Sequence, residues 1–350
     1  LLIIGLVVIF GYFKSRQEEK RPGAIEVSQP QTPSPLPLTE TAPLATKTPT
    51  TVPPTTTTKP YQLLFNQSFL YLDLDYPLLY VYDPKQEVIK YLNLEDETYK
   101  EIAKVSNLKN AWLSEDKTKI ALETDKGFSL LDLKTDSLYQ LPPLTKKVIL
   151  ASNVYLYLSD EKRISYLASF QNGKITKIRD LGILNPDFVV FKNGLLIYEA
   201  NSPIFYLEFK NLSILKLFLE AKSEFSLLAN KNKDLLFINF KENNIWQSEI
   251  IDLNKKIKYS FSWATIKDKC TFDDVLVCAV PNDLINFSFE DWLMLKPNYD
   301  EKIIIYNPQN NEIKEVNIEE KFDFVRPKLT PLGIIAWNRI DAKFYLLKPE

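Results

Sequence analysis

One phrase recurs along this chain: an apolar strand, a short polar turn and a second strand. Its seven copies occupy residues 78–92, 127–141, 163–178, 203–217, 246–260, 302–316 and, in a shorter form, 343–350. Aligned on their turns, at Asp83, Asp132, Ser169, Glu208, Asp252, Asn307 and Lys348, neighbouring copies lie 37 to 55 residues apart, about 44 on average. A period of this size is typical of β-propeller blades, which are four-stranded sheets that bury their faces only against one another.

The repeats therefore predict an all-β fold, a seven-bladed β-propeller over residues 61–350, with six or eight blades as alternatives. Other apolar strand pairs precede several copies, at 110–122, 188–198, 225–240 and 330–347, and these supply the remaining strands of a blade. The last copy holds only a third strand. We expect residues 61–66 to provide the fourth strand of that blade and so to close the ring, because an open sheet edge is a liability.

Residues 1–13 are entirely apolar or aromatic apart from two glycines. As a helix they would span about 20 Å, which is less than the roughly 30 Å hydrocarbon core of a bilayer. The chain starts without methionine, and a few more apolar residues would complete a span. We therefore expect an uncleaved transmembrane anchor. A signal-peptide core is the alternative, but no small-residue cleavage site of the A-x-A kind comes after it.

Residues 14–60 are predicted to form a disordered linker, because residues 22–60 contain ten prolines and eleven threonines. Such a segment stays extended without a core and typically holds a domain away from a cell surface. The basic residues Lys14, Arg16, Lys20 and Arg21, taken alone, favour a cytoplasmic location for the rest of the chain. The linker favours the opposite orientation. We expect a single-pass protein of the cytoplasmic membrane with its propeller on the extracytoplasmic side.

Several functional classes are disfavoured by composition. The formal charge is −2 and the basic residues are scattered, so nucleic acid is not an expected partner. The chain has no histidine, which removes Ser–His–Asp and Cys–His catalytic sites and His-ligated zinc. No glycine-rich phosphate loop and no calcium-loop spacing occurs. We predict no catalytic residue, cofactor or metal site, and interpret the acidic pairs at 73/75, 273/274 and 290/291 as turn and surface residues.

One segment departs from the blade pattern. Residues 281–300 form an excursion between two strands and contain four large apolar side chains: Phe287, Phe289, Trp292 and Met294. Irregular loops on a regular scaffold are common binding sites. These side chains either fold back onto the ring or form an exposed anchor for a partner, with Trp292 as its centre.

The only two cysteines, Cys270 and Cys278, flank a short turn and can face each other across one hairpin. We predict a disulfide between them, as two cysteines in an exported protein suggest. Two buried free thiols are the alternative.

Some motifs resemble known propellers. NAWLSEDKTKIAL at 110–122 resembles a TolB-like or WD40-like blade. KCTFDDVLVCAVP at 269–281, EDW at 290–292 and IIAWNRIDAKFYLL at 334–347 resemble an uncharacterised family of membrane-anchored TolB/WD40-like propellers from small-genome bacteria of candidate phyla. Phe272 and Val277 replace a tryptophan and a tyrosine of that pattern. The resemblance implies the propeller fold and the membrane location, and it implies no particular activity.

We therefore interpret the chain as a membrane-anchored binding or scaffolding module for a protein or a surface polymer. The alternatives are a carboxylate-dependent propeller hydrolase or lyase and a structural subunit of an envelope complex. Three or more Asp, Glu, Arg or Tyr residues from different blades at the mouth of the central channel would favour an enzyme. Apolar aromatic side chains at one rim would favour a binding module.

Overall fold

A computed structural model describes residues 60–348, apart from 161–163, 184, 200, 223–224, 231–232, 244 and 283–299. The predicted anchor at 1–13, nearly all of the predicted linker at 14–60, and the side chains of Phe287, Phe289, Trp292 and Met294 lie outside the described residues. Within the described ranges, no helix has the length and apolar character needed to cross a membrane.

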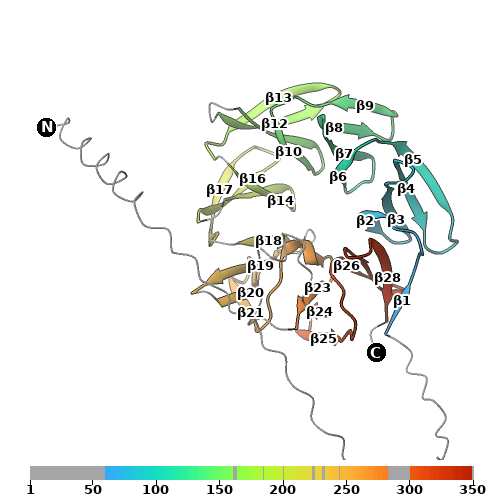
Figure 1. The fold of residues 1–350 in the computed structure, drawn as a ribbon. Coiled ribbons are helices and arrows are strands. Elements are labelled where there is room, and N and C mark those ends of the chain that lie inside the picture. The colour runs from blue at the N-terminus through green and yellow to red at the C-terminus, as the bar shows by residue number, and fades with distance from the viewer. Residues whose placement is uncertain are drawn as a thin grey trace, which may run out of the picture. The chain divides into compact units, whose positions relative to one another are not determined.

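Seven antiparallel sheets of four strands stand side by side around a ring (Figure 1). The predicted seven-bladed propeller is confirmed. In blades 1 to 6 the four strands are consecutive in the chain and run from the inside of the ring outward. Blade 7 takes its outermost strand from the start of the domain.

The strands fall into four sets by their position in the blade, each set running from blade 1 to blade 7. The innermost strands are β2 (Leu70–Asp75), β6 (Leu108–Leu113), β10 (Thr145–Leu150), β14 (Asp187–Phe191), β18 (Ser226–Ala229), β22 (Cys270–Phe272) and β26 (Phe324–Thr330). The second strands are β3 (Leu78–Asp83), β7 (Lys119–Thr124), β11 (Val154–Ser159), β15 (Gly194–Tyr198), β19 (Leu235–Glu242), β23 (Leu276–Pro281) and β27 (Gly333–Asn338).

The third strands are β4 (Val88–Asn93), β8 (Gly127–Asp132), β12 (Ser165–Gln171), β16 (Pro203–Glu208), β20 (Ile245–Asp252), β24 (Glu301–Asn307) and β28 (Lys343–Leu347). The outermost strands are β5 (Tyr99–Lys104), β9 (Ser137–Gln140), β13 (Lys174–Asp180), β17 (Ile214–Glu220), β21 (Ile257–Phe261), β25 (Glu312–Val316) and β1 (Tyr61–Leu63). A short 3-10 turn, η1 (Lys267–Lys269), precedes β22.

The ring closes as the sequence predicted, with β1 pairing antiparallel with β28. The paired residues are 61–63, and the backbone N–H of Leu64 adds a hydrogen bond of 2.9 Å to the carbonyl of Phe344. The pairing covers the sheet edge of blade 7 that would otherwise be open.

Among the described residues, the core consists of seven apolar clusters, one between each pair of neighbouring blades. Alternate residues of a strand point to opposite faces of its sheet. In β15, Leu195 and Ile197 pack towards blade 3, whereas Leu196 and Tyr198 pack towards blade 5. Because both faces are buried, the second strands are almost continuously apolar.

The repeated turn has a local chemical cause. In each of five described four-residue loops, the Asp or Asn before the loop accepts a hydrogen bond from the backbone N–H two residues later. The last residue of each loop has a positive φ. The residues before the loops are Asp83, Asp132, Asp252, Asn307 and Asn338, and the last residues are Glu87, Asp136, Lys256, Asn311 and Ala342.

This turn occurs at both ends of the sheets, which corrects one part of the repeat alignment. The copy at 78–92 covers the second and third strands of blade 1, whereas the copy at 127–141 covers the third and fourth strands of blade 2. Asp83 and Asp132 therefore lie at opposite ends of their sheets, although the alignment treats them as equivalent. The blade count is unaffected, because each blade still contributes one copy.

The two ends of the ring differ in the connections that they carry. One end, the excursion face, holds the connections between blades and those between second and third strands, including the one from β23 to β24 that contains the excursion. The N–H of Asn282 donates to the carbonyl of Asp300 at 2.8 Å and closes the base of that excursion. The other end, the hairpin face, holds the turns between first and second and between third and fourth strands.

Candidate functional site

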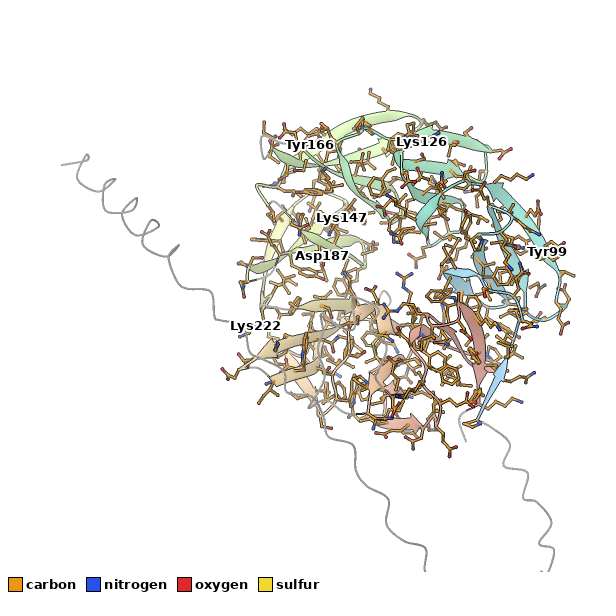
Figure 2. The ribbon with its side chains drawn as sticks, in the orientation of Figure 1. Tyr99, Lys126, Lys147, Tyr166, Asp187 and Lys222 are labelled. Carbon is orange, nitrogen blue, oxygen red and sulfur yellow. A yellow bond between two sulfur atoms is a disulfide. The ribbon has the colours of Figure 1, made fainter. Side chains whose placement is uncertain are left out.

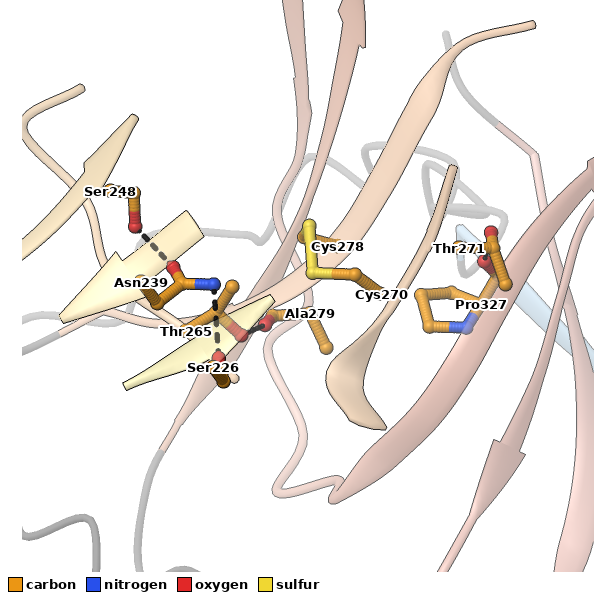
Figure 3. The surroundings of a disulfide bond; sticks show 9 residues. All are labelled: Ser226, Asn239, Ser248, Thr265, Cys270, Thr271, Cys278, Ala279 and Pro327. Atoms are coloured by element: carbon orange, nitrogen blue, oxygen red, sulfur yellow. Dashed lines mark hydrogen bonds between the residues drawn. A yellow bond between two sulfur atoms is a disulfide. The ribbon is translucent and has the colours of Figure 1, made fainter. Parts of the chain in front are cut away.

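A disulfide joins Cys270 of β22 to Cys278 of β23, as predicted, and their Cα atoms lie 4.2 Å apart (Figure 3). Both cysteines are buried in the apolar cluster between blades 5 and 6. The hydroxyl of Thr265 donates to the carbonyl of Ala279 at 2.7 Å. These contacts fix the first hairpin of blade 6, whose second strand leads into the excursion.

A buried group of charges holds the base of the excursion. Lys269, at the end of η1, pairs with Glu301, the first residue of β24, at 2.5 Å, and also with Asp323, which precedes β26. Their exposed fractions are only 2%, 1% and 3%. Arg339 Nε donates to Asp323 Oδ2 at 2.6 Å, and the N–H of Phe324 donates to Glu301 at 2.9 Å.

Burial raises the pKa of the Glu301 carboxyl, and the nearby Lys269 ammonium opposes that effect. The charges are balanced, with two cations and two carboxylates, so the group can stay ionised in the interior. The group connects three segments of the chain: η1 before blade 6, the start of β24 after the excursion, and the residue that precedes β26 of blade 7. No local sequence pattern marks this group, because its members are far apart and each stands beside an ordinary strand.

A second group of charges, the Asp187 cluster, joins three blades near the centre of the ring. It consists of Asp187 of β14, Lys147 of β10 and Lys267 of η1. Lys147 Nζ lies 2.6 Å from one carboxylate oxygen of Asp187, and Lys267 Nζ lies 3.4 Å from the other. Figure 2 shows Lys147 and Asp187 together on the inner side of the ring, whereas Tyr99 and Lys222 lie at its outer edge.

An ion pair adjoins the Asp187 cluster. Arg326 of β26 lies 3.9 Å from Asp268 of η1. Arg326 sits at a bulge and has a φ of 46°, in the left-handed region. Blades 3, 4, 6 and 7 thus each bring charged, partly exposed side chains to the inner end of the excursion face.

The chemistry of these groups favours fixed charge over proton transfer. Burial alone would raise the pKa of Asp187, but Lys267 and Lys147 outweigh it and hold that pKa below its ordinary value. A general acid or base works best with a pKa near the operating pH, and Asp187 is instead held as a carboxylate. In the described part of the chain, no three His, Cys, Asp or Glu residues gather in a way that would hold a metal ion.

The features expected of an enzyme and of a binding module are both represented only in part. Asp187, Asp268 and Arg326 do come together from different blades, as an enzyme would require, yet each is engaged with an opposite charge. The apolar rim that a binding module would require is expected from Trp292 and its neighbours, which lie outside the described residues.

Two residues of the acidic pairs singled out in the sequence form ion pairs between blades. Asp73 pairs with Lys117 of the next blade. Asp273 pairs with Lys328 at 2.9 Å, and Lys328 also donates to the carbonyl of Leu74 at 2.9 Å. These contacts connect blades 6, 7, 1 and 2, which agrees with a structural interpretation of Asp73 and Asp273.

No protein-family model matches the chain, and no curated protein matches it in sequence. Solved structures do share its fold. An oligogalacturonate lyase from Vibrio parahaemolyticus superposes with a TM-score of 0.56 and 11% identity, covering 81% of this chain and 92% of that one. Streptogramin B lyase superposes with a TM-score of 0.53 and 12% identity, covering 83% of this chain and 97% of that one.

The β-propeller domain of Cps50 (Swd1) from Myceliophteria thermophila, a WD40 protein, gives a TM-score of 0.54 and 9% identity, covering 82% of this chain and 98% of that domain. The neighbours also include TolB from Acinetobacter baumannii, with a TM-score of 0.46 and 10% identity, covering 74% of this chain and 64% of that one. At these identities the likeness concerns the fold alone. It includes lyases as well as proteins that are not enzymes.

Proposed function

We propose that this propeller is a binding module whose partner is a protein that docks on the excursion face. The observation that carries the proposal is the position of the Asp187 cluster beside the base of the excursion. Lys267 and Asp268 belong to η1, and Lys269 of the same turn is paired with Glu301 at that base. Fixed charges beside a loop of apolar sequence match the usual anatomy of an interface, which has an apolar centre and a charged surround.

We further propose that the module is anchored in the cytoplasmic membrane by residues 1–13 and faces the extracytoplasmic side. The apolar sequence of that segment and the Pro/Thr-rich linker support this location. The disulfide supports it as well, because such bonds persist in oxidising compartments. Protease added to intact spheroplasts should digest the propeller without opening of the membrane if the orientation is right, and only after opening if it is wrong.

The docking proposal is tested by capture from native membranes with paired variants. Lys267→Glu reverses a charge of the Asp187 cluster, whereas Lys255→Glu reverses an exposed charge in the turn between β20 and β21, on the hairpin face. We expect one set of proteins to be lost with Lys267→Glu and with Trp292→Ala, and retained with Lys255→Glu. Equal capture by all variants would overturn the proposal. A fall in thermal stability of Trp292→Ala would instead assign Trp292 to packing.

A lyase is the second candidate, favoured by the gathering of Asp187, Asp268 and Arg326 from different blades and by the fold shared with two lyases. It is tested by incubating the chain with oligogalacturonate and measuring the absorbance of an unsaturated product. Product that disappears with Arg326→Ala would establish the lyase.

A structural subunit of an envelope complex is the third candidate. It is distinguished by a partner that stays bound through size-exclusion chromatography at high salt.

A further inference from the structure

Blade 3 differs from its neighbours at the hairpin face. Its outer turn has only two residues, Asn172 and Gly173, both at positive φ, and Gln171 pairs directly with Lys174. Asn-Gly is the preferred sequence for such a turn, because both positions need the left-handed region. The corresponding turns of blades 2, 5 and 6 have four residues. A shorter turn covers less of the neighbouring blade.

Beside this short turn lies a cavity of about 160 Å³ between blades 2 and 3, which we call the notch of blades 2 and 3. Tyr139 and Phe170 form its aromatic wall, with ring centroids 5.5 Å apart in an edge-to-face arrangement. Phe170 is buried, whereas Tyr139 of the outermost strand is partly exposed. The notch therefore offers an apolar surface that a ligand can reach from the hairpin face.

The rim of this notch is polar and has unused hydrogen-bonding capacity. Oδ1 of Asp132 accepts the N–H groups of Lys134 and Thr135, while Oδ2 has no hydrogen-bond partner among the described residues. The side-chain amides of Gln171 and Asn172 likewise make no hydrogen bond within the described ranges. Lys119 lies opposite Asp132 on the neighbouring strand and also lines the cavity.

An equivalent cavity between blades 5 and 6 provides an internal comparison. There Leu235 lies opposite Asp252, as Lys119 lies opposite Asp132. That cavity is larger, about 560 Å³, and no aromatic side chain of the described residues lines it. The four-residue turn of blade 6 contributes Pro308 and Gln309 to its wall instead. Lysines and aspartates line this counterpart too, so the aromatic wall is what distinguishes the notch of blades 2 and 3 from it.

We propose that the notch of blades 2 and 3 binds one neutral sugar ring, either a free saccharide or the end of a polysaccharide. A pyranose has an apolar C–H face that packs on an aromatic ring, and hydroxyls that both donate and accept hydrogen bonds. The carboxylate, ammonium and amide groups of the rim match those hydroxyls. The volume is below the 300–1,000 Å³ of sites for drug-sized ligands, which favours a single ring. Sugar binding is independent of the docking proposal, because the notch lies on the opposite face.

The test is saturation-transfer NMR on the full chain in a zwitterionic detergent that has no sugar headgroup. The probes are glucose, galactose, mannose, N-acetylglucosamine and N-acetylgalactosamine. We expect at least one sugar to bind with millimolar affinity, and its oligomers to bind through their end residue if the source is a polysaccharide. Monomer binding without oligomer binding would assign the notch to a free saccharide.

Two variants and one matched control make the result specific. Asp132→Asn and Tyr139→Leu should each weaken binding at least about tenfold, because the first replaces a charged acceptor oxygen with an amide donor and the second removes the aromatic ring. Asp252→Asn, at the equivalent position between blades 5 and 6, should leave binding unchanged. Asp132 is half-buried, and Asp132→Asn keeps the oxygen that accepts the turn N–H groups. This variant therefore stays folded and decides the test even if Tyr139→Leu does not. Absence of binding by every sugar, or binding insensitive to Asp132→Asn, would overturn the proposal.

Discussion

Tyr61 lies opposite Leu347, so the first described strand of the propeller is hydrogen-bonded to the last. The Tyr61 ring also contacts Phe322 and Tyr345, with centroids 5.1 and 6.1 Å away. Ring closure thus combines a strand pairing with an aromatic cluster. The two parts differ in kind, since the pairing depends on the backbone and the cluster on one side chain.

Tyr61→Ala tests the side-chain part of ring closure. The variant keeps the backbone pairing but removes a half-buried ring from three-way aromatic packing. We expect a loss of about 2 kcal/mol in the free energy of unfolding, below the value for a fully buried aromatic residue. Urea unfolding monitored by fluorescence measures it. Leu138→Ala is the control, because Leu138 is 64% exposed on an outermost strand and its loss should change stability by no more than about 0.5 kcal/mol.

Reduction of the disulfide should destabilise the propeller by about 2–3 kcal/mol, the chain-entropy value for a loop with a sequence separation of 8. The double variant Cys270→Ala/Cys278→Ala lacks the bond under all conditions. Dithiothreitol should therefore lower the denaturation midpoint of the native chain and leave that of the double variant unchanged. An equal response of both proteins to the reductant would show that the effect does not come from this bond.

Lys269→Ala should be among the most destabilising single changes in the ring. It leaves Glu301 and Asp323 buried close to each other, with Arg339 as the remaining cation of the group, and removal of one partner from a buried ion group typically costs about 3–5 kcal/mol. The control is Lys109→Ala, whose partner Asp125 is well exposed, so its loss should cost less than about 1 kcal/mol. Calorimetric unfolding of both variants provides the comparison.

Asp83→Asn and Asp132→Asn compare two residues that occupy equivalent positions in the repeat alignment. Both variants keep the oxygen that accepts the turn N–H groups. Asp83, however, is fully buried and pairs with Lys90 at 2.8 Å, so the change leaves a buried ammonium without its carboxylate, with Gln86 Oε1 at 3.3 Å as a neutral partner, and should cost about 3 kcal/mol. Asp132→Asn should be within about 0.5 kcal/mol of the native chain. Equal losses in urea unfolding would contradict the distinction between the two sites.

These residues also show what the sequence can and cannot predict. The seven blades, the closing strand and the disulfide are predictable from periodic apolar strands and from cysteine spacing, which are local patterns. The prediction that Asp83 and Asp132 occupy the same position was wrong, because the side-chain hydrogen bond that makes the turn is the same at either end of a sheet. Local sequence identifies the turn and leaves its place in the blade undetermined.

The candidate sites depend on contacts between distant residues, and no local pattern marks them. Lys267 reaches Asp187 from two blades away, and Lys269 reaches Asp323, only because the ring brings them together. The notch of blades 2 and 3 arises from a turn that is shorter by two residues. The Asn-Gly pair at 172–173 is visible in the sequence, but its consequence depends on Tyr139 of the neighbouring blade.

The pH dependence of stability provides a test of the Asp187 cluster. The pKa of Asp187 is lowered in the folded protein, so its contribution to stability is complete above the unfolded-state value of about 3.9 and is lost as the pH falls through the lower folded value. Asp187→Asn should therefore be less stable than the native chain at pH 7, by no more than about 1 kcal/mol because the group is partly exposed. Below a pH of about 4 the difference should shrink towards zero.

The measurement is urea unfolding of both proteins from about pH 7 to about pH 3, at low and high salt. Added salt should reduce the difference at neutral pH, since it screens partly exposed charges. Asp180→Asn is the matched control: Asp180 pairs with Lys177 at 2.6 Å on an exposed outermost strand, and its variant should track the native curve at every pH. A stability difference for Asp187→Asn that does not change with pH would mean that its carboxylate charge is not what holds Lys147 and Lys267 together.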